Sequence, residues 1–187
     1  MKQIIIILFL LLTSMLSASF KTGQTISYVD HDDGDYQKGK AQSYTRNNAK
    51  EVVVDNVTGL MWQDNSDVRT VKKRWLIREN YKDEYDDTSG DTASTYCADL
   101  SLGGYNDWRL PTRKELESIL DFGTRNPSLD PVFLNFLFKH PQNSQNYWTS
   151  TTSAESKFMA WKINFVSGHA KFLSSKIGRY HIRCVRN

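Results

Sequence analysis

The chain has 187 residues, of which 39% are apolar and 12% aromatic, and it carries 24 Lys and Arg against 21 Asp and Glu. This length suits one ordinary domain and excludes large multidomain machinery. The apolar content excludes a disordered chain. A formal net charge of +3 is too weak to favour nucleic acid or an anionic membrane as a partner.

Residues 1–19 have the pattern of a secretory signal peptide. One positive charge precedes an unbroken apolar run over residues 4–12, and small residues at 17–19 offer a cleavage site after Ser19. The apolar run is shorter than the roughly 20 residues that a membrane span needs. We therefore expect cleavage to leave a periplasmic or secreted protein with no membrane attachment.

Export changes the interpretation of the two cysteines, Cys97 and Cys184, because an oxidising compartment permits a disulfide. A bond that closes a loop this long stabilises a protein by about 4–5 kcal/mol in the chain-entropy model. A metal site needs more ligands than two distant cysteines, and a redox pair is normally closely spaced. We therefore expect a structural disulfide.

Residues 20–50 are polar and are predicted to be irregular. They include an acidic stretch at 30–35, for which a solvated loop and a calcium site are the two interpretations. An EF-hand loop has glycine at its sixth position and glutamate at its twelfth. Counted from Asp30, the sixth residue is Asp35 and no glutamate follows nearby, so the solvated loop is favoured.

The folded domain is predicted to span residues 51–187 and to begin with a hairpin. Its strands are 51–54 and 60–63, separated by a polar turn that contains a glycine. Residues 65–91 then form a charged insertion with a solvated face. The apolar residues at 75–77 are expected to attach this insertion to the body of the domain.

Two helices follow in the prediction. Residues 92–100 carry apolar side chains at i, i+3, i+4 and i+7, with Asp91 as N-cap and Cys97 on the buried stripe. The Thr-Arg-Lys-Glu sequence at 112–115 is a capping box. It starts a second helix that is expected to end near Leu120.

The rest of the chain is predicted to be β-structure, after short helical turns within 126–142. The expected strands are 147–150, 158–165, 170–173 and 180–185. In the second strand, alternation predicts an apolar face made of Met159, Trp161, Ile163 and Phe165. Cys184 lies in the last strand, so the predicted Cys97–Cys184 disulfide joins the first helix to the end of an α+β domain.

Several motifs resemble the Lcl C-terminal domain, a family named after a bacterial collagen-like adhesin. They are Thr-Gly-Leu-Met-Trp-Gln at 58–63, Leu-Gly-Gly-Tyr-Asn-Asp-Trp-Arg-Leu-Pro-Thr at 102–112, Tyr-Trp-Thr-Ser at 147–150 and Ile-Arg-Cys-Val-Arg at 182–186. The resemblance implies an exported bacterial protein with a C-type-lectin-like fold, in which two helices pack on a twisted, mainly antiparallel sheet. It also implies a binding function, because the founding adhesin attaches to sulfated polysaccharide and host surfaces.

We expect no catalytic residues, no cofactor and no metal. The Arg-Leu-Pro-Thr and terminal Arg-Cys segments are also similar to formylglycine-generating enzymes, which handle copper and oxygen with a cysteine pair near the C-terminus. Here only Cys184 lies in that region. No zinc-protease motif, nucleophile elbow or phosphate loop occurs. The histidines are scattered, and His169 and His181 are expected at surface or edge positions.

The first candidate binding segment lies in the insertion. Lys72, Lys73 and Arg74 are clustered cations beside Trp75, whose ring could stack on a sugar. This pattern suits an anionic or sulfated glycan. The alternative is a solvated, non-binding face.

The second candidate segment is Asp107, Trp108 and Arg109. These residues either line a polar ligand groove or hold their loop through a buried Trp and an Arg–carboxylate pair, and the second interpretation is favoured. The Glu-Pro-Asn and Gln-Pro-Asp signatures of calcium-dependent lectins do not occur. A third class of function is a structural or accessory protein that contacts an envelope or surface protein.

Overall fold

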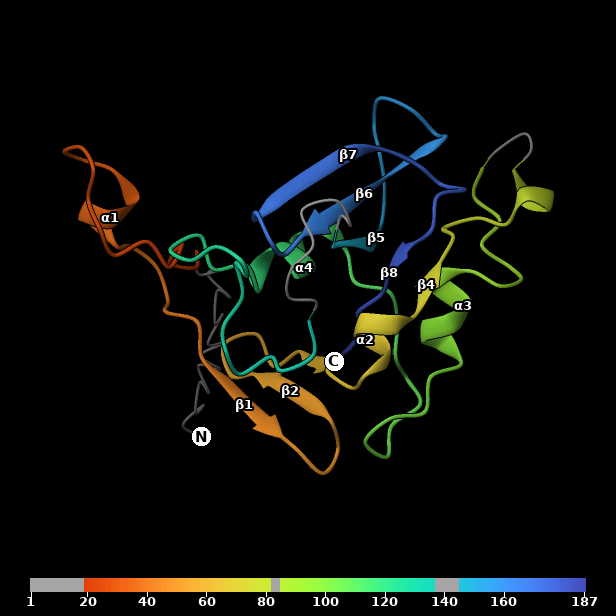
Figure 1. Cartoon of the computed structure of the whole chain (residues 1–187), viewed down its shortest axis with the longest axis horizontal. Coiled ribbons are helices and arrows are strands. Elements are labelled where there is room, and N and C mark those ends of the chain that lie inside the picture. The colour runs from red at the N-terminus through yellow and green to blue at the C-terminus, as the bar shows by residue number, and fades with distance from the viewer. Residues whose placement is uncertain (1–18, 82–84, 137–144) are drawn as a thin grey trace, which may run out of the picture.

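The computed structural model describes residues 19–81, 85–136 and 145–187. The predicted signal peptide lies outside the described residues except for Ser19, and so does the end of the segment 126–142. The described chain is a mixed α+β fold, mostly sheet, with four short α-helices (Figure 1). Within it, no helix is both long enough and apolar enough to cross a bilayer.

The strands form two sheets (Figure 1). The four-stranded sheet has the order β1 (Tyr44–Asn47), β2 (Val52–Asp55), β3 (Met61–Gln63), β9 (Val185–Arg186). The five-stranded sheet has the order β4 (Lys72–Lys73), β8 (Tyr180–His181), β5 (Asn146–Thr152), β6 (Met159–Asn164), β7 (His169–Ser175). The helices are α1 (Asp33–Tyr36), α2 (Asp67–Thr70), the 3-10 turn η1 (Arg78–Asn80), α3 (Ala93–Ala98) and α4 (Arg113–Ser118).

The four-stranded sheet contains the predicted hairpin and one strand that the sequence analysis missed. β2 and β3 are antiparallel, and their turn ends at Gly59, whose φ of 79° suits glycine. β1 pairs with the other side of β2, with Tyr44 opposite Asp55. The prediction that residues 20–50 are irregular is therefore wrong for β1. Its side chains are only half-buried or exposed, so an edge strand of this kind has no apolar signature.

In the five-stranded sheet, β5, β6 and β7 form an antiparallel meander, and β8 runs parallel to β5 with His181 beside Tyr147. β4 pairs with β8 at the edge. Because β4 comes from segment 65–91, the first half of the predicted insertion is an integral part of the domain. Its buried side chains are Val68, Trp75 and Leu76.

The last predicted strand, 180–185, is divided between the two sheets. β8 belongs to the larger sheet and β9 to the smaller one, and the buried residues 182–184 cross between them. Cys184 therefore lies immediately before β9 and not within a strand, which corrects the prediction. The chain cannot continue one straight strand here, because its two halves pair with different sheets.

α3 confirms the first predicted helix but has a different cap. Thr92 forms a capping box with Thr95, so Thr92 and not Asp91 is the N-cap. The Asp91 carboxylate instead pairs with Lys73 of β4. A threonine can satisfy the free N–H groups of a first helical turn as an aspartate can, and tertiary contact with β4 decides which residue does so.

α4 confirms the second predicted helix. Its capping box joins Thr112 and Glu115 as expected, and the helix ends at Ser118, two residues earlier than predicted. Leu116 and Ile119 are fully buried. They pack in one of two apolar clusters, and this cluster joins α4 to both sheets.

β6 does not present the single apolar face that its alternation predicts. Ala160 and Lys162 are buried, whereas Trp161 is only half-buried. Both sides of the strand are covered: the Arg113 guanidinium lies 3.7 Å from the Trp161 ring, and Lys162 Nζ lies 3.8 Å from the Tyr180 ring. A long cation can bury its stem over an aromatic ring, so the polar positions of this strand are buried too.

A buried ion pair lies where the two sheets meet. Asp64 follows β3, Arg183 lies in the crossing segment, and both side chains are 0% exposed with Nη1 and Oδ1 2.8 Å apart. Asp64 also pairs with Arg46 and accepts the backbone N–H groups of Leu134 (2.9 Å) and Asn135 (3.2 Å). The carboxylate thus connects β1, β3, the 134–135 loop and the crossing segment.

Replacement of Asp64 by alanine should leave Arg183 buried without its counter-charge. Breaking a buried pair costs about 3–5 kcal/mol, and we expect D64A to lower the free energy of unfolding in urea by that amount. The control is E117Q, which removes the partly exposed pair between Glu117 and Arg113. The control should cost about 0.5 kcal/mol or less. If D64A lowered the free energy of unfolding as little as E117Q does, Asp64 would not be a stabilising counter-charge for Arg183.

Candidate functional site

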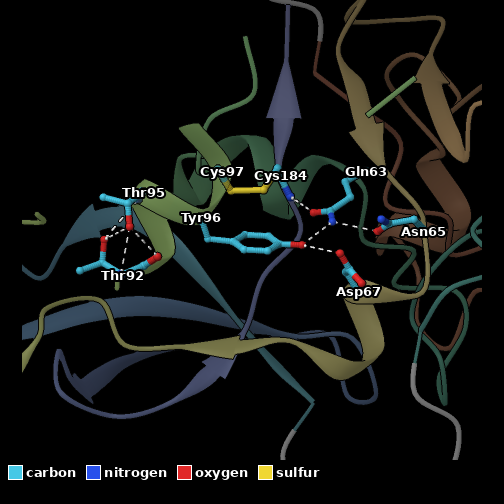
Figure 2. Close-up of a disulfide and its surroundings, with 8 residues drawn as sticks. All are labelled: Gln63, Asn65, Asp67, Thr92, Thr95, Tyr96, Cys97 and Cys184. Carbon is cyan, nitrogen blue, oxygen red and sulfur yellow. Dashed lines mark hydrogen bonds between the residues drawn. A yellow bond between two sulfur atoms is a disulfide. The ribbon is translucent and has the colours of Figure 1, made fainter. Parts of the chain in front are cut away.

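The Cys97–Cys184 disulfide is present, as predicted (Figure 2). It joins α3 to the end of the crossing segment, with the two Cα atoms 5.6 Å apart and a sequence separation of 87. Both cysteines are fully buried. The bond therefore fixes one side of α3 to the junction of the two sheets.

A hydrogen-bond network continues from Cys184 to Tyr96 of α3, beside the disulfide (Figure 2). The side-chain Oε1 of Gln63 accepts the backbone N–H of Cys184 (3.0 Å), and the side-chain Nε2 of Gln63 donates to the Tyr96 hydroxyl (3.0 Å). That hydroxyl donates to Asp67 of α2 (3.2 Å). Burial, followed by the nearby Asp67 charge, raises the pKa of Tyr96 from 10 to about 12. The network sets the position of the Tyr96 ring.

The face of α3 that carries Tyr96 borders a groove of about 410 Å³, which we call the polar groove. The backbone N–H of Ala93 donates to the Arg74 carbonyl (2.8 Å) and holds α3 beside β4 at this point. The groove is lined by Lys73, Gly90, Asp91, Thr95, Tyr96, Asp99, Leu100 and Ser101. It therefore offers an ammonium group, carboxylates, hydroxyls and one aromatic ring.

The structure places the four residues of the first candidate segment in different environments. Lys72 is exposed, and Lys73 lines the polar groove in an ion pair with Asp91. The Arg74 Nε atom donates to the Ile177 carbonyl (3.1 Å). Trp75 is 6% exposed and donates its indole N–H to a backbone carbonyl. The segment therefore attaches the chain to the sheet, and Trp75 has no free face for a sugar.

Asp107, Trp108 and Arg109 hold their loop, as the favoured interpretation predicts. Trp108 is buried, Arg109 makes a two-pronged ion pair with Glu115 (2.9 and 2.6 Å), and Arg186 makes one with Asp107 (2.6 and 2.9 Å). The Arg109 hydrogen bonds lower the pKa of Glu115 to about 2. None of the three lines the polar groove.

The acidic stretch 30–35 uses its carboxylates as backbone caps. Asp32 accepts the N–H groups of Tyr28 (2.8 Å) and Asp35 (3.0 Å), and the Tyr28 bond lowers the pKa of Asp32. Among residues 19–81, 85–136 and 145–187, no three His, Cys, Asp or Glu side chains are grouped so as to hold a metal ion. The calcium alternative therefore gains no support from the geometry of this loop.

The sequence analysis did not find the polar groove, because its walls come from β4, the loop at 90–91 and α3. One signal was present: Thr95 and Asp99 are four residues apart and so share a face of the predicted helix. Nothing local indicates that β4 lies opposite that face. The role of Gln63 was missed for the same reason, since its partners are distant in sequence.

Residues 51–186 match the family model of the Lcl C-terminal domain. This range includes the polar groove, the disulfide and every strand except β1. The chain therefore belongs to the Lcl C-terminal domain family, as its motifs indicated. No match was found among curated proteins.

His181 is buried, whereas the sequence analysis expected a surface or edge position. It is 2% exposed on β8, with its ring 5.5 Å from that of Tyr147. The edge of the sheet is formed instead by β4, whose Lys72 lies opposite His181. Burial, reinforced by the Lys72 charge, lowers the pKa of His181 from 6.5 to about 4.

This shift predicts a loss of stability in mild acid. The unfolded chain takes up a proton on His181 near pH 6.5, but the folded protein does so only near pH 4. The free energy of unfolding should thus fall between these pH values, by on the order of 2–3 kcal/mol. In pH-dependent urea denaturation, H181Q should flatten this fall and H169Q, at an exposed position, should not. If the free energy of unfolding of H181Q depended on pH as steeply as that of wild type, the acid effect would not come from His181.

Removal of the disulfide should also destabilise the domain. We expect the C97A/C184A variant to lose about 2–5 kcal/mol in urea denaturation, the usual effect of deleting a native disulfide. Wild-type protein unfolded without reductant should show no free thiol. Labelling of both thiols under these conditions would contradict the bond, and a loss well below this range would show that α3 is held by its other contacts.

Proposed function

We propose that this chain is an exported, non-catalytic binding module of the Lcl C-terminal type, which binds a glycan in the polar groove. The observation that carries the proposal is the groove itself, with hydrogen-bonding side chains along an opening of about 410 Å³. Ligand sites commonly have volumes of roughly 300–1,000 Å³. The groove is thus large enough for a short stretch of saccharide.

The groups in the groove suit a ligand rich in hydroxyls. Asp99 accepts hydrogen bonds, Lys73 donates them, and the hydroxyls of Thr95 and Ser101 do both. The Tyr96 ring adds an apolar surface for the carbon face of a sugar. A saccharide presents both kinds of surface at once, which favours it over a purely apolar or purely ionic ligand.

The charge of the groove favours a neutral or amino-bearing glycan over a sulfated one. Lys73 is already paired with Asp91, and Asp99 adds an exposed carboxylate. A sulfate group placed here would meet net negative charge. The sulfated glycan expected from the sequence remains the second candidate, supported by the exposed ammonium of Lys72 on the neighbouring position of β4.

Binding without catalysis is supported by the state of the cysteines. The two thiols of the chain are joined to each other and buried, so neither is present as the thiolate that nucleophilic or metal chemistry uses. This argues against the formylglycine-generating alternative.

Export and a lectin-like fold complete the proposal. A buried disulfide is typical of proteins in oxidising compartments, which supports a periplasmic or secreted location. The link from α3 to the residue before β9 corresponds to the bridge expected of a C-type-lectin-like domain. The disulfide thus supports both the location and the fold that we propose for this member of the Lcl C-terminal domain family.

A glycan array and quantitative binding can test the groove. D99A and S101A should each weaken retention of the best neutral or amino-bearing glycan by tenfold or more, while E155A, at an exposed position outside the groove, should leave it unchanged. Retention should persist from about 50 mM to 500 mM salt, since hydrogen bonds in a groove are screened less than surface charges.

The same array distinguishes the second candidate. Retention of sulfated glycans that falls with salt and is lost in K72A, but not in D99A, would replace the groove with a basic surface. Retention of no glycan at all would overturn both and leave a protein partner as the function.

A further inference from the structure

Residues 23–38, which we call the N-terminal arm, project from the body of the domain around α1 (Figure 1). The arm carries four exposed apolar or aromatic side chains: Ile26 (59% exposed), Tyr28 (77%), Val29 (67%) and Tyr36 (49%). The described chain has seven large apolar or aromatic side chains that are at least 38% exposed. More than half of them are therefore gathered on sixteen residues, a concentration that is typical of an interaction surface.

The arm has a defined shape. Asp32 accepts the backbone N–H groups of Tyr28 and Val29 and caps α1, which fixes the loop that carries the exposed side chains. Gly34 packs so closely on the Ile26 carbonyl that a Cβ atom would overlap it. The arm thus presents its apolar side chains on a closed turn, which reduces the conformational entropy lost on binding.

The domain also contains an apolar pocket of about 410 Å³ in the segment 124–136. Its apolar walls are formed by Pro127, Leu129, Pro131, Phe133, Leu134 and Phe136. Leu134 is 56% exposed at the pocket. The lining is predominantly apolar, so the pocket suits an aromatic or aliphatic side chain better than a saccharide.

The root of the arm lies against the start of the segment that forms the pocket. The backbone N–H of Phe122 donates to the Thr22 carbonyl (2.7 Å). Gly23 and Gly123 are in contact, since a Cβ added to Gly123 would overlap the Gly23 carbonyl. From this root the arm points away from the body (Figure 1), so it does not fill its own pocket.

Charge supports the same pairing of surfaces. The arm carries exposed carboxylates at Asp30 and Asp33, and the guanidinium of Arg125 at the pocket makes no hydrogen bond or ion pair with the part of the chain that the structure describes. Two nearby carboxylates, Asp121 and Asp130, accept the backbone N–H groups of their own loop. Among the described residues that line the pocket, Arg125 is the one that is charged.

We infer that two copies of this chain associate by placing the arm of each in the apolar pocket of the other. The point where the arm leaves the domain lies next to the pocket. A two-fold axis at this point therefore places each arm at the pocket of the other copy, so that the two contacts form together, as a closed dimer requires. The tip residues Tyr28 and Val29 enter the pocket, and the arm carboxylates face Arg125. The contact is separate from the polar groove and is independent of glycan binding.

Sedimentation velocity over a concentration series tests this dimer, using the protein in the form that cells produce. Wild type should change from monomer to dimer as its concentration rises. Y28D in the arm and L134D in the pocket should each weaken self-association at least tenfold, and F158D, at an exposed aromatic outside both surfaces, should not. Thermal melting of each variant shows that it is folded.

Mixing the variants provides the decisive comparison. Y28D keeps an intact pocket and L134D an intact arm, so their equimolar mixture should recover one of the two contacts and form heterodimers that neither variant forms alone. Loss of dimer in Y28D but not in L134D would mean that arms pair with arms and would overturn the inference. A wild type that stays monomeric at every concentration would also overturn it, and would leave the pocket to a different partner.

Discussion

The ion pair between Asp64 and Arg183 holds together the two sheets of this domain. Desolvating two charges is costly, and the cost is met here by filling the lone pairs of the carboxylate with Arg46, Arg183 and two backbone N–H groups. Arg183 lies in the crossing segment, so the pair also sets where the chain leaves one sheet and joins the other. The four-stranded and five-stranded sheets thereby share one fixed junction.

The candidate glycan site depends on that junction. Cys184 is the neighbour of Arg183, and α3 is held there by the disulfide and by the hydrogen bond between Gln63 and Tyr96 (Figure 2). β4 reaches α3 by pairing with β8, which enters the crossing segment from the opposite end. The walls of the polar groove are therefore positioned by contacts made in the core.

The features that the sequence predicts well are those with local causes. The hairpin follows from β-branched residues around a polar turn, the start of α4 from its capping box, and the disulfide from two cysteines in a chain that begins with a signal-peptide pattern. The motifs around Trp108 and Cys184 also identify the family before any coordinates are considered.

The features that it does not predict have distant causes. β1 is a polar edge strand, and Thr92 replaces Asp91 as a cap because Asp91 pairs with Lys73. His181 is a polar residue, and it is buried on β8, which is not an edge strand because β4 pairs beside it. In each case a partner far along the chain decides between locally equivalent arrangements, so short-range patterns contain no information about the outcome.

The span of the disulfide has a consequence for the order of events in the cell. Between Cys97 and Cys184 lie α4 and β5 to β8, so oxidation encloses most of the larger sheet in a single covalent ring. Where thiols are kept reduced, that ring is open and α3 is retained by noncovalent contacts alone. Formation of the groove is thereby coupled to the redox state of the surroundings, and the reduced chain lacks the rigidity that the bond supplies.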